Sequence, residues 1–299
     1  MKNKASELVS ILMPAHNAEA YIKYAIESII NQRYKNWELI CINDSSTDKT
    51  QDILKKYQKL DSRIKVYKNS VKKGIGFSLN LGLKYAQGKF IARMDADDIS
   101  FPERISKQVE FLTKNKRVVA CGGQVAMINS KNEIFAYKYF PTNSKALYKM
   151  IMKLIPLQHP TIMARSKVIK NYKYDTTLEV AEDVDMLFYL LSKGEINNLE
   201  DVIYQYRKHN NSNSYIHVKK TFYTTFISRF KAIKKYGYKP SVSGISISIL
   251  ELLLITFMPS KVILNIFEAI RFYPPLVNKL RETLTITNPT INISGRNPK

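Results

Sequence analysis

The chain has few of the residues that mark several large classes of protein. Only two cysteines, Cys41 and Cys121, occur among 299 residues, and both lie in apolar runs. A disulfide framework needs more cysteines, so we expect two buried thiols in a reducing cytoplasm. The four histidines lack the spacing of zinc ligands, which argues against a zinc site.

Long apolar segments are also missing. The first apolar run, residues 8–13, is too short for the core of a secretory signal. A later run, residues 245–258, is shorter than the ~20 residues that a membrane-spanning helix needs, and it contains Glu251. We therefore expect neither a secretory leader nor a transmembrane helix.

Acidic residues are scarce relative to basic ones. The sequence has 25 Asp and Glu against 47 Lys and Arg, a formal net charge of +22. Nearly half of the excess lies in residues 219–299, which hold 13 basic and 3 acidic residues. This excess indicates an anionic partner, which could be a phosphate group, an acidic lipid or a nucleic acid. No recognised nucleic-acid-binding motif is present, so no nucleic-acid partner is expected, although a basic nucleic-acid-binding module stays an alternative.

What is present is an alternation of strand-like and helix-like segments. The pattern predicts strands at 8–13, 37–42, 64–67, 90–94 and 161–164, and helices at 17–33, 53–60, 77–86, 102–112, 145–154 and 182–191. It also predicts a strand, a turn and a strand in 118–128, with the turn at Gly122 and Gly123. Such a β-α-β-α order is typical of a doubly wound α/β sheet. Residues 245–258 and 261–273 predict further helices.

Three carboxylates, Asp95, Asp97 and Asp98, follow the strand predicted at 90–94. Carboxylates this close repel one another unless a cation lies among them. They fall at the carboxyl end of a strand, which is where open α/β sheets bind ligands. Oxygen ligands suit Mn²⁺ or Mg²⁺ bound together with substrate phosphates. A solvated acidic turn that caps the next helix is the alternative.

Two further acidic positions have the same ambiguity. Asp44 ends the second predicted strand, where it could accept a hydrogen bond from a ribose hydroxyl or a base, or could belong to a helix cap. Glu182 and Asp183 open a predicted helix. There they could complement the helix dipole. One of them could instead be a general base that takes the proton of a sugar hydroxyl.

Four segments resemble, in order and spacing, the motifs of the family 2 glycosyltransferases. They are residues 9–17 (VSILMPAHN), 43–48 (NDSSTD), 88–98 (GKFIARMDADD) and 181–185 (AEDVD). The resemblance spans roughly residues 8–212. It implies the α/β GT-A fold, a mostly parallel doubly wound sheet with a helical C-terminal extension. The expected domains are a catalytic domain at 1–218 and a basic helical extension at 219–299.

The resemblance also implies roles for individual residues. Pro14 and Ala15 would border the base, Asp44 would contact the uracil or ribose, and Asp97, with Asp95 or Asp98, would hold Mn²⁺ or Mg²⁺ at the diphosphate. The donor site would also include Asn17, Arg93, Asp95, Ala96 and Asp97. Apart from the resemblance, Lys73 could approach the donor phosphates or lie in a solvated turn, and Arg93 could pair with the acidic cluster. Asp183 would be the base of an inverting displacement. Residues near the acceptor, or closing over the diphosphate, would be His159, Glu182, Arg207 and His209. The chain departs from the family at His16, where Tyr is usual, and at Asn43, where a first Asp is frequent.

The implied reaction is transfer of a hexose or N-acetylhexosamine from a nucleotide sugar, with UDP favoured, to a hydroxyl of a glycan or lipid-linked acceptor. The expected setting is the synthesis of a bacterial surface polysaccharide such as lipopolysaccharide or capsule. A nucleotidyltransferase is the alternative enzyme, but it should have a Gly-rich basic loop where residues 14–18 stand. We expect a cytoplasmic protein whose basic C-terminal part meets an anionic membrane, packs on the catalytic domain or contacts a second subunit in a homodimer.

Overall fold

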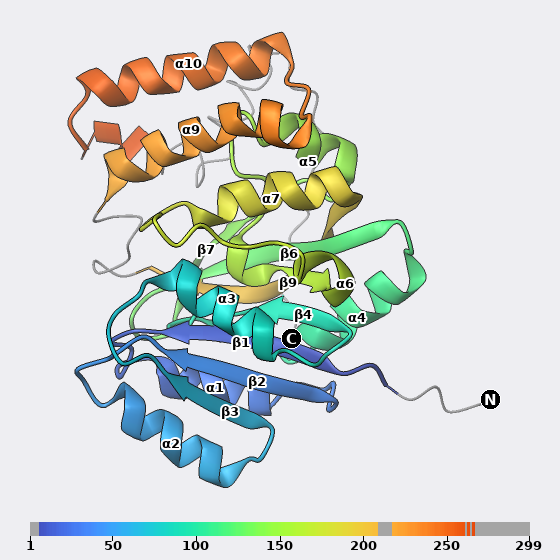
Figure 1. The fold of residues 1–299 in the computed structure, drawn as a ribbon, viewed down its shortest axis with the longest axis vertical. Helices are drawn as coiled ribbons and strands as arrows, with labels where there is room; N and C mark the ends of the chain where they lie inside the picture. The colour runs from blue at the N-terminus through green and yellow to red at the C-terminus, as the bar shows by residue number, and fades with distance from the viewer. Residues whose placement is uncertain (1–5, 209–216, 261, 264, 267–299) are drawn as a thin grey trace.

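The computed structural model describes residues 6–208, 217–260, 262–263 and 265–266 of the chain (Figure 1). Strands and helices alternate in its first part. They are β1 (Val9–Ala15), α1 (Ile22–Ile30), β2 (Trp37–Asn43), α2 (Thr50–Leu60), β3 (Ile64–Lys68), α3 (Ile75–Tyr85), β4 (Phe90–Arg93), β5 (Ile99–Ser100) and α4 (Arg104–Lys114). The alternation predicted from the sequence is thus present, and each predicted strand end lies within two residues of the observed one.

The second part is less regular. Its elements are β6 (Val118–Ile128), β7 (Ile134–Lys138), α5 (Ser144–Met150), a 3₁₀ turn (His159–Thr161), β8 (Met163–Arg165), α6 (Ser166–Ile169), α7 (Glu182–Lys193), β9 (Glu195–Arg207), α9 (Val218–Tyr236) and α10 (Val242–Phe257). The sequence pattern does not predict β5, β7 or β9. The predicted helix at 261–273 lies mostly outside the described residues.

One mixed sheet carries all the described strands, in the order β3-β2-β1-β4-β8-β6-β9-β5, with β7 on the side of β6. The strands β1 to β4 run parallel because crossover helices connect them. β8 is antiparallel to both β4 and β6, so the sheet is mixed beyond β4 rather than mostly parallel. The predicted GT-A-type α/β architecture is confirmed, with this change to its strand directions.

The two glycines of β6 do not form the predicted turn. A Cβ added to Gly122 would lie 2.4 Å from Oδ1 of Asn198, and one added to Gly123 would lie 2.6 Å from Cδ1 of Ile203. Both neighbours belong to β9, which pairs with β6 over most of its length. Glycine is therefore needed here for the close approach of two strands, and the ladder shifts register at this point as a bulge.

Hydrophobic residues fill both faces of the sheet because successive strand residues point to opposite sides. Val9, Ile11 and Met13 of β1 join one cluster with helices α1, α2 and α4, whereas Leu12 joins a second cluster with α3 and α7. Ala232 of α9 belongs to the second cluster, so α9 packs against α7 on this side of the sheet. The continuous apolar sequence of β1 follows from burial on both sides.

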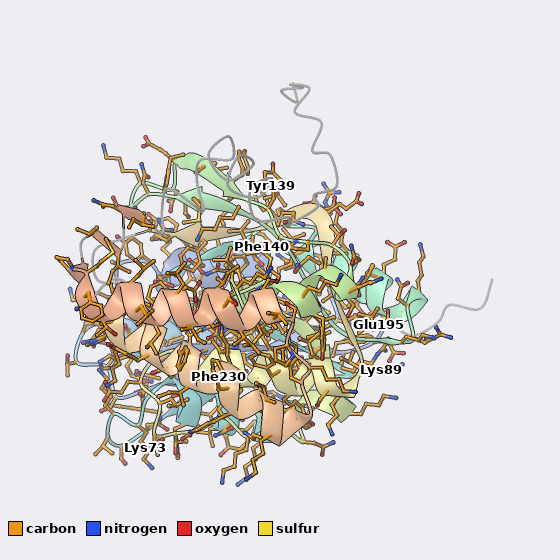
Figure 2. All side chains as sticks on the ribbon, turned by 90° about the horizontal axis from the view of Figure 1, so that it is seen from above. Lys73, Lys89, Tyr139, Phe140, Glu195 and Phe230 are labelled. Carbon is orange, nitrogen blue, oxygen red and sulfur yellow. The ribbon has the colours of Figure 1, made fainter. Side chains whose placement is uncertain are left out.

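The C-terminal helices form two layers above α7. α9 lies on α7, and α10 lies outside α9 (Figure 1). Viewed from above, α10 crosses the molecule as the layer nearest the viewer (Figure 2). None of the described helices is long and apolar enough to cross a membrane. The boundary predicted at residue 218 falls at the start of α9 and stays a prediction.

Candidate functional site

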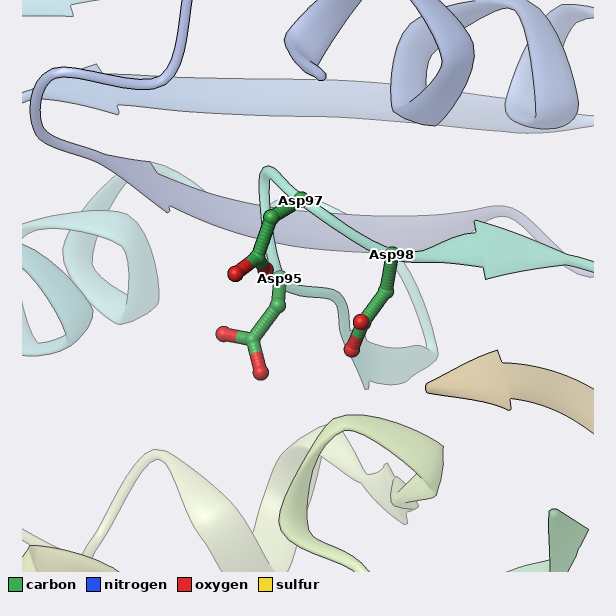
Figure 3. A group of neighbouring side chains, drawn as sticks. All are labelled: Asp95, Asp97 and Asp98. Carbon is green, nitrogen blue, oxygen red and sulfur yellow. The ribbon is translucent and has the colours of Figure 1, made fainter. Parts of the chain in front are cut away.

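The carboxylates of Asp95, Asp97 and Asp98 gather in the loop after β4 (Figure 3). One oxygen of each lies within 4.8 Å of the others. Burial raises the pKa of Asp95, and burial together with the two neighbouring carboxylates raises the pKa of Asp98 well above its ordinary value. Oδ2 of Asp98 is buried without a hydrogen bond of good geometry from any described residue. A divalent cation would relieve both conditions, so these residues fit Mn²⁺ or Mg²⁺.

Arg207 holds this loop from β9. Its backbone N–H donates to Oδ1 of Asp98 at 2.7 Å, and its Nε donates to the carbonyl oxygen of Asp97 at 2.6 Å. The guanidinium also donates to the carbonyl of Asn129 at 2.7 Å and to Oδ1 of Asn132 at 2.6 Å. Arg207 is 1% exposed and lies over the ring of Tyr21. These contacts engage Arg207 in positioning the acidic loop, and its closure over the diphosphate stays a prediction.

Two other buried side chains fix the backbone of the loop. The hydroxyl of Tyr204 accepts a hydrogen bond from the backbone N–H of Asp95 at 3.1 Å. Arg104 of α4 donates through Nη2 to the carbonyl oxygens of Arg93 and Pro160, at 2.7 and 2.8 Å. Neither residue stands out in the sequence, because each reaches the loop only through the tertiary fold. The motif indicates that Arg207 is a functional residue, but it does not indicate that Arg207 holds the acidic loop.

Asp44 organises the loop before α3. Its carboxylate accepts hydrogen bonds from Nδ2 of Asn69 and from the backbone N–H groups of Lys73 and Gly74, at 2.7 to 2.8 Å. Gly74 has φ +87°, a conformation that glycine adopts without strain. Oδ1 accepts two of these bonds and Oδ2 accepts one, so Oδ2 can still accept from an O–H or N–H of a nucleoside. Contact between Asp44 and the nucleoside stays a prediction.

The first two motifs bind each other where β1 and β2 end side by side. Oδ1 of Asn17 accepts from the backbone N–H of Thr47 at 2.9 Å, and the backbone N–H of Asn17 donates to Oγ of Ser46 at 3.0 Å. Nδ1 of His16 lies 2.8 Å from the carbonyl oxygen of Asp44. Asn17 and Ser45 both have positive φ. Such strained residues persist only where their surroundings hold them, often at functional sites.

The other predicted donor contacts fall on the same edge of the sheet. Pro14 and Ala15 end β1 beside Ile42 and Asn43 of β2. The ammonium of Lys73 lies over the ring of Phe77, 4.4 Å from its centroid, and its backbone holds Asp44. Ala96 is buried in the first hydrophobic cluster, and its contact with the donor stays a prediction. His209 lies outside the described residues.

The acidic motif Glu182-Asp183 starts α7. Ala181, just before it, has φ +57° and ψ +30°, a left-handed conformation that is strained for alanine. Burial raises the pKa of both carboxyl groups. The backbone therefore places two partly desolvated carboxylates at a fixed helix start, which suits a base that needs more basicity than a free aspartate.

His159 and Arg93 lie near this motif, and Arg93 also pairs with Asp95 of the acidic loop. Nδ1 of His159 lies 3.6 Å from Oε1 of Glu182, and its Nε2 lies 3.2 Å from the hydroxyl of Tyr174. Burial lowers the pKa of His159 to about 3, so the imidazole is neutral at physiological pH. Nη1 of Arg93 lies 2.5 Å from Oδ2 of Asp95, and the same guanidinium favours the charged form of Glu182. Arg93 thus stands between the two acidic groups.

The comparisons with known proteins agree with this geometry. Residues 10–175, more than half of the chain, match the family model for glycosyl transferase family 2. The chain belongs to this family. It is therefore a glycosyltransferase, as its curated relatives are named. Family membership excludes the nucleotidyltransferase and the nucleic-acid-binding module as descriptions of its main activity.

Two relatives and one solved structure illustrate the match. An uncharacterized glycosyltransferase of Haemophilus influenzae is 36% identical over 220 residues, covering 70% of this chain and 68% of its own length. The O-antigen biosynthesis glycosyltransferase WbnJ of Escherichia coli is 30% identical over 220 residues, covering 71% and 84%. Residues 1–349 of Staphylococcus aureus TarS, in complex with UDP-GlcNAc, superpose with a TM-score of 0.62 at 20% identity, covering 84% and 73%. That last likeness concerns the fold.

Proposed function

We propose that this glycosyltransferase moves a hexose or N-acetylhexosamine from a UDP-sugar to a hydroxyl of a glycan or lipid-linked acceptor, with inversion at the anomeric carbon. The main support is the juxtaposition of the Asp95–Asp97–Asp98 cluster with Glu182 and Asp183 around Arg93. The UDP-GlcNAc complex of TarS supports a UDP donor, and the name of WbnJ supports a role in bacterial surface polysaccharide synthesis. The proposed location is the inner face of the cytoplasmic membrane.

On the donor side, Asp95, Asp97 and Asp98 would hold Mn²⁺ or Mg²⁺. When bound, this ion supplies Lewis-acid stabilisation of the departing diphosphate. Arg207 and Tyr204 keep the acidic loop in place before the donor arrives, through their hydrogen bonds to Asp97, Asp98 and Asp95. Preorganised groups of this kind stabilise developing charge without rearranging during the reaction.

On the acceptor side, Asp183 takes the proton of the attacking hydroxyl. As that proton moves to the carboxylate, the acceptor oxygen forms a bond to the anomeric carbon. The bond from that carbon to the phosphate oxygen breaks, and the nucleoside diphosphate leaves with the electron pair. One displacement from the opposite face inverts the configuration. The raised pKa of Asp183 increases its basicity, while cationic Arg93 favours the charged form of its neighbour Glu182.

The decisive variant is Asp183→Asn, which keeps the shape of the side chain and removes the base. We expect transfer to fall by about 10²–10⁴-fold. Binding of the UDP-sugar, followed by calorimetry, should be unchanged. Glu179→Gln is the matched control, because Glu179 precedes the same helix but pairs with Lys220 at the surface. Full turnover by Asp183→Asn would exclude Asp183 as the base.

A further inference from the structure

The outward face of α10 is apolar. Leu250, Leu253 and Phe257 are 55%, 52% and 82% exposed, and Ile249 and Leu254 accompany them. Their spacing of three and four residues places them on one side of the helix. Within the part of the chain that the structure describes, nothing covers this side. We call these five residues the α10 apolar face.

The inward side of the same helix is small and polar around Gly244, Ser248 and Glu251, and it also buries Ile255. Oγ of Ser248 donates to the carbonyl oxygen of Met152 at 2.5 Å, and Oε2 of Glu251 lies 2.5 Å from Nη1 of buried Arg229. At Gly244, an added Cβ would lie 3.0 Å from Cβ of Met152. An ordinary amphipathic surface helix buries its large apolar side chains, whereas α10 exposes five of them and buries Gly244, Ser248 and Ile255.

This orientation is fixed rather than accidental. Rotating α10 to bury its leucines would remove Ser248 and Glu251 from their partners and leave Arg229 buried without its carboxylate. The helix layer is also tied to the catalytic domain, because Nζ of Lys235 on α9 lies 2.9 Å from Oδ2 of Asp185, two residues after Asp183. Whatever binds the α10 apolar face is therefore held in a defined orientation to the start of α7.

The segment that carries this face is strongly basic. Residues 217–260 contain seven Lys and Arg and one acidic residue, Glu251, which is paired inward. Lys231, Lys234 and Lys239 of this segment are exposed. An exposed apolar helix face in a segment with exposed cations matches the chemistry of an anionic lipid surface, where side chains enter the acyl boundary and ammonium groups meet the head groups.

We propose that the α10 apolar face docks on an anionic membrane surface, with α10 lying in the plane of the interface. The position of α10 as the outermost layer leaves its length available for such contact (Figures 1 and 2). The inference rests on the proposed function in one respect: a lipid-linked acceptor would be presented at that surface. A second copy of the chain, or residues 267–299, would be competing occupants of the same face.

The test uses the full chain and vesicles of phosphatidylcholine with about 30 mol% phosphatidylglycerol, against vesicles of phosphatidylcholine alone. The wild-type protein should sediment with the anionic vesicles and less so as salt is raised. The double variant Leu253→Gln, Phe257→Gln should lower the partition coefficient at least about tenfold. The matched control is Phe135→Gln, Tyr137→Gln, which removes two aromatic side chains that are similarly exposed on β7, and its binding should be unchanged.

A fluorescent label at Phe257→Cys distinguishes the competing occupants, because both native cysteines are buried. A blue shift on adding anionic vesicles supports membrane docking. A label that is already in an apolar environment in the dilute protein would show that the chain covers its own helix, and a shift that depends on protein concentration would show a second copy. Either result, or absence of wild-type binding to vesicles, would overturn the proposal. Release of UDP from the donor is measured in parallel, so a failure of the proposed function is seen separately.

Discussion

The acidic loop and α10 each keep side chains in an unfavourable environment, and in both cases buried polar contacts stabilise the arrangement. In the loop, buried hydrogen bonds from Arg207 and Tyr204 hold three carboxylates together against their mutual repulsion. In the layer, buried contacts of Ser248 and Glu251 hold leucine and phenylalanine side chains out in water. Both are local conflicts that a folded chain sustains only by stabilisation elsewhere, and such conflicts concentrate at functional sites. The proposed partners differ, because we propose a cation for the loop and an anionic membrane surface for α10.

The largest expected effect is a loss of stability when the buried side chain that holds the acidic loop is removed, compared with removal of a charged side chain at the surface. Arg207→Ala keeps the backbone bond to Asp98 but leaves three acceptors, on Asp97, Asn129 and Asn132, without their donor. It should lower the free energy of unfolding by about 3 kcal/mol. Arg33→Ala is the control, because Arg33 is 72% exposed in its pair with Glu103 and should cost less than about 1 kcal/mol. Urea unfolding measures both. Equal losses for the two variants would contradict the support assigned to Arg207.

The second largest expected effect is the dependence of folding stability on Mn²⁺ and on pH. A folded-state pKa above the unfolded value of about 3.9 means that Asp95 and Asp98 disfavour folding once ionised. The metal-free protein should therefore lose stability as pH rises from about 4 through these raised values. Mn²⁺ should raise the melting temperature more at pH 7.5 than at pH 5, with a gain of about 2.7 kcal/mol at a hundred times its dissociation constant. An equal or smaller Mn²⁺ effect at pH 7.5 would count against the cluster as a cation site.

A smaller effect tests the hairpin between β6 and β7. Asn132 has φ +68°, and its Oδ1 accepts from Arg207. Asn132→Gly tolerates this backbone but removes the acceptor, so it should cost about 1 kcal/mol of stability. Because Arg207 holds Asp97 and Asp98, the variant should also weaken Mn²⁺ binding, followed by the paramagnetic resonance signal of free Mn²⁺. Asn132→Asp keeps the acceptor and should bind Mn²⁺ more tightly than the glycine variant; the reverse order would disconnect the hairpin from the loop.

The smallest expected effect tests whether Leu253 of α10 is exposed in the folded protein. Leu253→Gln changes an exposed apolar residue that packs on no described part of the core. Its free energy of unfolding should stay within about 0.5 kcal/mol of the wild type in the absence of vesicles. A loss of 2 kcal/mol or more, about the value for burying a leucine side chain, would show that the residue is covered in the folded protein.

Strand ends were the most predictable part of the site. β1, β2 and β4 are buried, so their apolar runs mark where each strand stops and where Asp44 and Asp95 begin their loops. β9 could not be found in this way, because its residues alternate irregularly between buried and exposed positions. Its Arg207 meets Asp98 across 109 positions of sequence, a contact that no local pattern encodes.

The orientation of α10 is a second feature that the sequence pattern does not predict. The run at 245–258 is apolar on most sides, so periodicity alone does not say which face turns inward. The structure turns the face with Gly244 and Ser248 inward, since a small residue at each of these positions permits close packing on Met152. Small residues four apart in an apolar helix are the signal that could have indicated this orientation. Likewise, Gly122 and Gly123 indicate close strand contact here, although the same pair is typical of a turn.

The central claim is that a cation held by Asp95, Asp97 and Asp98 and a base at Asp183 together perform transfer from a UDP-sugar. A donor screen that detects released nucleoside diphosphate, with Mn²⁺ and with a chelator, tests it most directly. We predict release of UDP that requires Mn²⁺, is abolished by Asp97→Ala, and yields a product of inverted anomeric configuration. Equal release in the presence of chelator, with Asp97→Ala fully active, would contradict the account.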